Sequence, residues 1–160
     1  MEKIRLDVVG MSYSQSQSGA YDLILGEHDG KRRLPIIIGG FEAQAIAIEI
    51  EKIRTPRPLT HDLFKAFADA YHITVTEVVI NQFSEGVFYA KLICTDGTTE
   101  NEVDSRTSDA IALALRFDAP IFVAENVIME ATIMDKEKYE KEMQDFKDFL
   151  KDIKPSDFHK

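Results

Sequence analysis

The sequence predicts a single α+β domain, in which a mixed β-sheet of about six to seven strands is flanked by three helices and followed by a charged C-terminal helix. Short apolar or alternating segments bounded by glycine-containing turns indicate the strands. Longer segments with apolar residues three and four apart indicate the helices. Strands and helices occur in blocks, without regular β–α alternation, and 160 residues are enough to bury one core.

Three strands are predicted at the N-terminal end. The first alternates cleanly, so that Ile4, Leu6 and Val8 share one face and polar residues share the other. A Ser/Gln-rich loop follows it, and an Asp-Gly pair that suits a tight hairpin separates the second and third strands. These strands are expected at residues 3–11, from Tyr21 to Leu25 and from Leu34 to Ile38.

Two helices are predicted next. Residues 41–54 show both a strand and a helix period, but their length and their Ala, Glu and Gln content favour a helix. Prolines 56 and 58 end it, and Thr60 is the expected N-cap of the second helix. That helix carries an apolar side that we expect to face the core, formed by Leu63, Phe64, Phe67 and Tyr71.

The second half of the domain returns to strands and adds a third helix. Residues 73–83 and 87–94 are predicted to form a hairpin, and a further strand is expected at 98–103. Thr107 or Ser108 is the expected cap of the third helix, which ends before a short buried strand at 121–123. The inward side of that helix is expected to consist of Ile111, Ala114 and Leu115.

A charged helix is predicted at residues 135–153, and we divide the chain into a domain at 1–130 and a helical extension at 131–160. The apolar residues of this helix follow a heptad-like spacing: Tyr139, Met143, Phe146, Leu150 and Ile153. This seam can dock on its own domain or on a second subunit. We expect a homo-oligomer.

The composition limits the possible partners and compartments. With 28 acidic and 19 basic residues the net charge is −9, which argues against loose binding of nucleic acid. All seven arginines precede residue 117, so a local arginine-rich site is still possible, although Arg5 and Arg116 are interpreted as surface residues. The lone Cys94, with no predicted signal peptide or membrane span, predicts a cytoplasmic protein without membrane contact.

The common phosphate-loop, dinucleotide-binding and nucleophile-elbow motifs are absent from the sequence. Two helix starts, residues 57–63 and 104–110, each place an arginine before the helix and an aspartate in its first turn. The aspartates and hydroxyls can simply cap the helices, which the spacing alone favours. Alternatively, the arginines and free helix N–H groups can hold a phosphate in a polar pocket.

Three long segments, in order along the chain, resemble the bifunctional nuclease (BFN) domain family: IIIGGFEAQAIAIEIEKIRTPRPLTHDLF, GVFYAKLI and EVDSRTSDAIALALRFDAPIFVAENV. The resemblance covers roughly residues 3–130. The family usually has proline at the position of Thr107, where threonine should preserve the helix start. The helical hairpin that some relatives append has no room in this chain.

The resemblance implies a nuclease that hydrolyses phosphodiester bonds in RNA and DNA. The expected acid–base residues are His61, Asp62, Asp104 and Asp109, and the expected phosphate-binding residues are Arg57, Arg106, Thr60 and Ser108. A divalent Mg²⁺ or Mn²⁺ ion would be held by Glu42, Asp104 and Asp109. The alternative is a non-catalytic binding or regulatory module, in which the same pocket recognises a small anion, a nucleotide or a protein partner.

Overall fold

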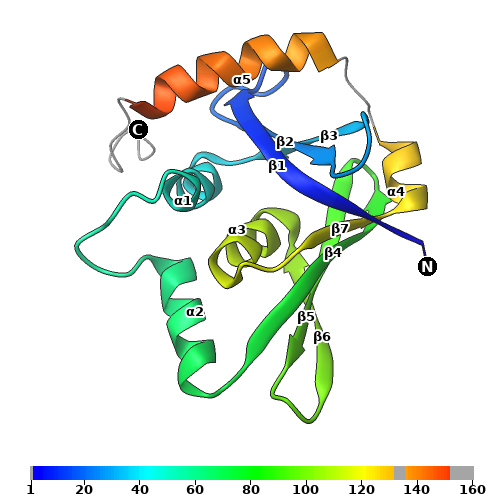
Figure 1. Ribbon diagram of the computed structural model, residues 1–160. Coiled ribbons are helices and arrows are strands. Elements are labelled where there is room, and N and C mark those ends of the chain that lie inside the picture. The colour runs from blue at the N-terminus through cyan, green and yellow to red at the C-terminus, as the bar shows by residue number, and fades with distance from the viewer. Residues whose placement is uncertain (1, 132–135, 152–160) are drawn as a thin grey trace.

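The computed structural model describes residues 2–131 and 136–151, with residues 136–142 described as backbone alone. One mixed sheet of seven strands forms the centre of the described part, and five helices surround it (Figure 1). The strands are β1 (Lys3–Tyr13), β2 (Tyr21–Glu27), β3 (Arg33–Ile38), β4 (Thr74–Ser84), β5 (Val87–Thr95), β6 (Glu100–Arg106) and β7 (Ile121–Ala124). The helices are α1 (Gly40–Ile50), α2 (Thr60–Ala70), α3 (Thr107–Phe117), α4 (Glu125–Glu130) and α5 (Lys136–Lys151).

The strand order across the sheet is β3-β2-β1-β7-β4-β5-β6. Two antiparallel meanders, β1–β2–β3 and β4–β5–β6, lie on either side of β7, which pairs antiparallel with β1 and parallel with β4. The tight turn between β4 and β5 uses positive φ at both Glu85 and Gly86, as the predicted hairpin requires. The α+β class and the mixed sheet are therefore confirmed.

The main core lies between the sheet and the helices α1 and α3, which pack against each other. Both helices contribute several small residues to this core, among them Ala43 and Ala47 on α1 and Ala110 and Ala114 on α3, all essentially buried. Ile46 and Ile111 belong to the same core and are fully buried. The packing of α1 on α3 brings Glu42, at the start of α1, close to Arg106, at the start of α3, and so positions part of the candidate site.

The apolar side of α2 was expected in the core, and this prediction is wrong. Leu63, Phe64, Phe67 and Tyr71 are 44–65% exposed, and Ala68 is the buried residue of this helix. Helix periodicity defines an apolar side but does not say what covers it. In this structure α2 contacts α3 through its polar residues and leaves its apolar side outward.

Other local predictions need smaller corrections. The residues in N-cap position are Leu59 and Arg106, one residue before the predicted Thr60 and Thr107. The short helix α4 was missed, because six residues carry too little periodicity to predict a helix. Among the described residues, no helix is both long enough and apolar enough to cross a membrane.

Helix α5 docks on its own domain, against β1 (Figure 1). Phe146 and Leu150 are buried, and a Cβ placed on Gly10 would lie only 2.7 Å from Met143 Cγ. Three of the five predicted seam residues are thus in contact within the same chain, whereas the side chains of Tyr139 and Ile153 lie outside the described residues. This seam is therefore not an available surface for a second subunit.

Candidate functional site

The two helix starts singled out in the sequence meet in space. His61, in the first turn of α2, places Nε2 2.9 Å from Oδ1 of Asp109, in the first turn of α3. Both residues line a pocket of about 860 Å³, together with Thr60, Asp104 and Arg106. These five residues belong to α2, β6 and α3. The prediction that the two motifs share one pocket is thus confirmed for them.

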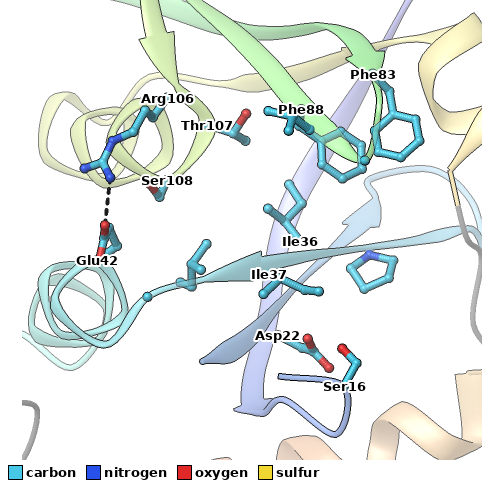
Figure 2. Close-up of a pocket in the computed structure, with 15 residues that line it drawn as sticks. Ser16, Asp22, Ile36, Ile37, Glu42, Phe83, Phe88, Arg106, Thr107 and Ser108 are labelled. Atoms are coloured by element: carbon cyan, nitrogen blue, oxygen red, sulfur yellow. Dashed lines mark hydrogen bonds and ion pairs between the residues drawn. The ribbon is translucent and has the colours of Figure 1, made fainter. Parts of the chain in front are cut away.

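A chain of charge-assisted hydrogen bonds extends from His61 across the site. The second oxygen of Asp109, Oδ2, accepts a hydrogen bond from Arg106 Nε at 2.9 Å. Arg106 Nη1 then donates to Glu42 Oε1 at 2.8 Å, at the start of α1 (Figure 2). Four side chains from α1, α2 and the β6–α3 junction are thereby linked in the order Glu42, Arg106, Asp109, His61.

Burial and charge act in opposite directions on Asp109. Burial disfavours its ionised form, but the hydrogen bonds from Arg106 and His61 outweigh this effect and lower its pKa below the ordinary value of 3.8. In turn, the hydrogen bonds that Arg106 donates to the carboxylates of Asp109 and, to a smaller extent, Glu42 raise the pKa of Arg106. Asp109 is therefore an anion at neutral pH, and an anion can only accept the hydrogen bond from His61.

This bond fixes the tautomer of His61. If Asp109 Oδ1 accepts, Nε2 carries the proton, and Nδ1 of the neutral ring holds a lone pair. Within the described residues Nδ1 has no hydrogen-bond partner. The side chain is 16% exposed, so that it is shielded but still reached by solvent. A histidine oriented by a carboxylate in this way can act as a general base.

Asp62 lies next to His61 but is engaged elsewhere. Its Oδ1 accepts from Arg116 Nε at 2.8 Å, and its Oδ2 accepts from the Leu59 backbone N–H at 3.0 Å, which caps α2. Burial opposes its ionisation, yet the Arg116 and Leu59 hydrogen bonds lower its pKa. Both oxygens thus have partners that hold α2 in place, and this arrangement corresponds to the capping interpretation.

Arg116 itself is a residue that the sequence did not point to, and its interpretation as a surface residue is wrong. Its side chain is 3% exposed and extends between the helices. Besides Asp62 it donates to the Ala112 carbonyl at 3.0 Å and to the Ala45 carbonyl at 3.1 Å. One guanidinium therefore connects α3, α2 and α1 directly behind the site.

The remaining predicted site residues are spread around this network. Asp104 and Thr60 are exposed and line the pocket, whereas Arg57 is exposed and is not part of its lining. Ser108 is buried and lines a second pocket of about 560 Å³, which shares Glu42 and Arg106 with the first and also contains Phe83 and Phe88 (Figure 2). The structure therefore does not place all eight residues in one pocket.

The predicted metal ligands do not form a ligand set. Glu42 and Asp109 are joined by the guanidinium of Arg106, which already supplies the positive charge between them. In the part of the chain that the structure describes, no three His, Cys, Asp or Glu side chains are arranged to hold a metal ion. As they stand, Glu42, Asp104 and Asp109 do not fit Mg²⁺ or Mn²⁺.

The apolar side of the pocket was also not anticipated. Phe41, Phe64 and Val103 contribute to its lining and are 44–64% exposed. Of these three residues only Phe64 was expected in the core, because a helix period alone does not distinguish an exposed apolar side chain from a buried one. A charged network beside an apolar wall is typical of a binding site for an organic ligand.

Comparison with known proteins identifies the family. The sequence pattern of the bifunctional nuclease domain matches residues 23–136. Two relatives from strains of Mycobacterium tuberculosis, the uncharacterized proteins MT1877 and Rv1829, are each 41% identical over 160 residues, covering 94% of this chain and 95% of their own. The matched range contains every residue of the linked network, and the chain belongs to the bifunctional nuclease domain family.

Proposed function

We propose that this protein is a nuclease that hydrolyses phosphodiester bonds in RNA and DNA, and that hydrolysis occurs at the pocket around His61. One observation carries the proposal: Asp109 orients His61 and binds Arg106, so that a base and a cation lie beside one another. The family name supports the reaction class. A group that takes a proton and a positive charge near the phosphorus can together promote hydrolysis of a phosphodiester.

In the proposed reaction, Nδ1 of His61 takes a proton from a water molecule, and the water oxygen attacks phosphorus. The bond from phosphorus to the leaving oxygen breaks, and this oxygen takes a proton from solvent water as it leaves. Water is the nucleophile because DNA has no 2′-hydroxyl group. Asp109 stabilises the imidazolium that forms, as a carboxylate partner of histidine generally does.

Arg106 is the residue proposed to contact the phosphate. Its side chain is 65% exposed, far more than its partners, so that part of the guanidinium faces the solvent. Its forked donors suit phosphate oxygens. Thr60 and Asp104, on the same pocket, are proposed to position the substrate and the water, whereas Arg57 and Ser108 would contact more distant parts of a longer substrate.

A binding or regulatory role is the second candidate, and one observation favours it. Arg106 is shared by two carboxylates, so the network has little positive charge left for a polyanion. The net charge of −9 acts in the same direction, since phosphate neutralisation supplies most of the affinity for nucleic acids. In this role the pocket recognises a small anion, a nucleotide or a protein partner and no bond is broken.

The decisive experiment measures cleavage of fluorescent single-stranded RNA, single-stranded DNA and duplex DNA by the wild type and by His61→Ala. We expect His61→Ala and Asp109→Asn to lower the rate by about 10²–10⁴-fold, the usual contribution of general acid–base catalysis. Asp104→Asn tests separately whether the exposed carboxylate of Asp104 contributes to cleavage. Each substrate is assayed with EDTA, with Mg²⁺ and with Mn²⁺, which tests the metal expectation directly.

His28→Ala is the matched control. His28 also pairs with an aspartate, because its Nδ1 lies 2.8 Å from Asp7 Oδ2, but the pair is half-exposed and outside the pocket. Cleavage should be unchanged in this variant. Equal cleavage by the wild type and His61→Ala would show that a contaminating nuclease, or a different site, is responsible. No cleavage by the wild type under any condition would refute the nuclease proposal and favour the binding role.

The single unpaired Cys94 suits a reducing compartment, and we place the protein in the cytoplasm.

A further inference from the structure

The largest unexplained feature of the molecule is the outward side of α2. We define the α2 face by Leu63, Phe64, Phe67 and Tyr71, which are 61%, 44%, 62% and 65% exposed. Their positions along the helix fall within one side of it, and the rings of Phe67 and Tyr71 are in contact at 4.9 Å. Among the described residues nothing packs over this face, and Figure 1 shows α2 at the margin of the molecule, attached on the α3 side.

An apolar groove lies directly beside the α2 face. It has a volume of about 320 Å³ and runs between α2 and the strands β4, β5 and β6. Phe64 and Phe67 form one wall, and most of the remaining lining is apolar: Ala68, Ile73, Val75, Cys94 and Val103. The molecule therefore presents an apolar ridge and an apolar groove next to each other.

We propose that the α2 face and its groove bind a second copy of this chain. Taking roughly 200 Å² for each large side chain, the exposed fractions of the α2 face and Val103 correspond to about 560 Å². That is at the upper end of the largest apolar patch on a typical monomer, about 300–600 Å². It supplies most of the roughly 800 Å² that each partner contributes to a stable interface, before the polar rim is included.

The neighbouring ridge and groove favour a second copy over other occupants. A two-fold axis beside α2 would place the ridge of each copy in the groove of the other, so that one surface is complementary to itself. Nucleic acid is disfavoured, because Asp96 lines the groove, Asp104 lines the adjoining pocket, and Lys65 on α2 is already paired with Asp69. The buried part of the contact would contain no charge from the α2 face.

The proposal does not depend on nuclease activity, but it has a consequence for the site. Phe64 and Val103 line both the groove and the pocket around His61. A second copy seated on α2 would therefore border the mouth of each site and add a wall to it. Loss of the dimer would leave the network of His61, Asp109 and Arg106 in place, since none of these residues belongs to the α2 face.

The first test is the mass of the full chain by light scattering and sedimentation equilibrium from about 1 to 100 μM, a range that detects dissociation constants in the micromolar region. We expect twice the chain mass of 18.1 kDa at the upper end. Added salt should strengthen the dimer, because it screens the repulsion between two copies of charge −9 and favours apolar burial. A monomer at all concentrations and salt levels would overturn the proposal.

Charge substitutions then locate the interface. Phe67→Asp should be a folded monomer, and Leu63→Asp is a second variant in case the first does not fold. Met129→Asp is the matched control: Met129 is 69% exposed on α4, outside the α2 face, so that this variant should dimerise like the wild type. A dimer that survives in folded Phe67→Asp and Leu63→Asp would show that another surface is responsible and would refute the assignment.

The lone thiol gives an independent readout. Cys94 lines the groove and is partly exposed in the single chain, so that a second copy should shield it. We expect the rate of maleimide labelling to fall as protein concentration rises, and this dependence to be absent in Phe67→Asp. A labelling rate that is the same at all concentrations in a dimeric wild type would place the interface away from the groove.

Discussion

Arg116→Met is expected to lower the stability of the domain substantially, although sequence patterns alone place Arg116 on the surface. Methionine keeps much of the volume of the buried stem but removes every donor. Three acceptors would then lose a hydrogen bond: Asp62 Oδ1, the Ala112 carbonyl and the Ala45 carbonyl. A buried acceptor without a partner retains its desolvation cost.

The size of the effect can be estimated from the exposure of the partners. Breaking a buried ion pair by removing one member typically costs about 3–5 kcal/mol. The Arg116 side chain is 3% exposed but Asp62 is 33% exposed, so that water can still solvate the carboxylate. We therefore expect a loss of about 2–4 kcal/mol in the free energy of unfolding, towards the lower end of the range for buried pairs. In a protein of this length this corresponds to a fall in Tm of roughly 5–15 °C.

The pH dependence gives the estimate a second, independent check. The folded-state pKa of Asp62 is lower than its ordinary value of 3.8, so the ion pair contributes its full stability above pH 3.8. That contribution is lost as the pH falls through the folded-state pKa. The stability difference between the wild type and Arg116→Met should thus be constant near neutral pH and should shrink below about pH 4.

Denaturant titration followed by circular dichroism measures the free energy of unfolding at each pH, and thermal melts measure Tm. Arg5→Met is the control, because Arg5 is exposed and makes no side-chain ion pair within the described residues. Its stability should match that of the wild type within about 0.5 kcal/mol, as is usual for surface substitutions. Equal stability of Arg116→Met and Arg5→Met would refute the role assigned to the buried guanidinium.

Two further predictions concern packing. Ile111→Ala, at a fully buried position of α3, should lower the free energy of unfolding by about 2–5 kcal/mol. Phe64→Ala should cost well under half of that, because Phe64 is 44% exposed. Urea titration of both variants tests which side of each helix is buried. Gly10→Ala should cost about 1–3 kcal/mol by displacing Met143 and loosening α5, and the double variant with Met143→Ala should recover most of the loss. If the double variant is no more stable than Gly10→Ala, the contact with α5 is not the cause.

The sheet was predictable because its signal is local. Alternation along residues 3–11 and the glycine turns of the two meanders depend only on neighbouring residues, and the structure has strands at these places. The capping residues were displaced by one position, since Leu59 supplies the backbone geometry while Asp62 supplies the hydrogen bond. Boundaries of this kind depend on which neighbouring group satisfies the first N–H groups.

The candidate site was predictable in its residue types but not in its connections. His61, Arg106 and Asp109 were singled out by charge and position, and they do meet. The sequence could not show that Arg106 lies between Glu42 and Asp109, where a metal ion was expected. Nor could it show that Arg116 binds Asp62, because the first contact depends on how α1 packs on α3 and the second on how α2 packs on α3.

The outward apolar side of α2 and the position of His61 have a common cause. A helix that buries its apolar side is oriented by that burial, but α2 buries little besides Ala68. Its orientation therefore depends on polar contacts, chiefly Asp62 with Arg116 and His61 with Asp109. Loss of Arg116 should consequently disturb the placement of His61 as well as stability, and loss of Asp109 should loosen α2. Because α2 buries so little of its apolar side, its aromatic residues are available to a second copy of the chain.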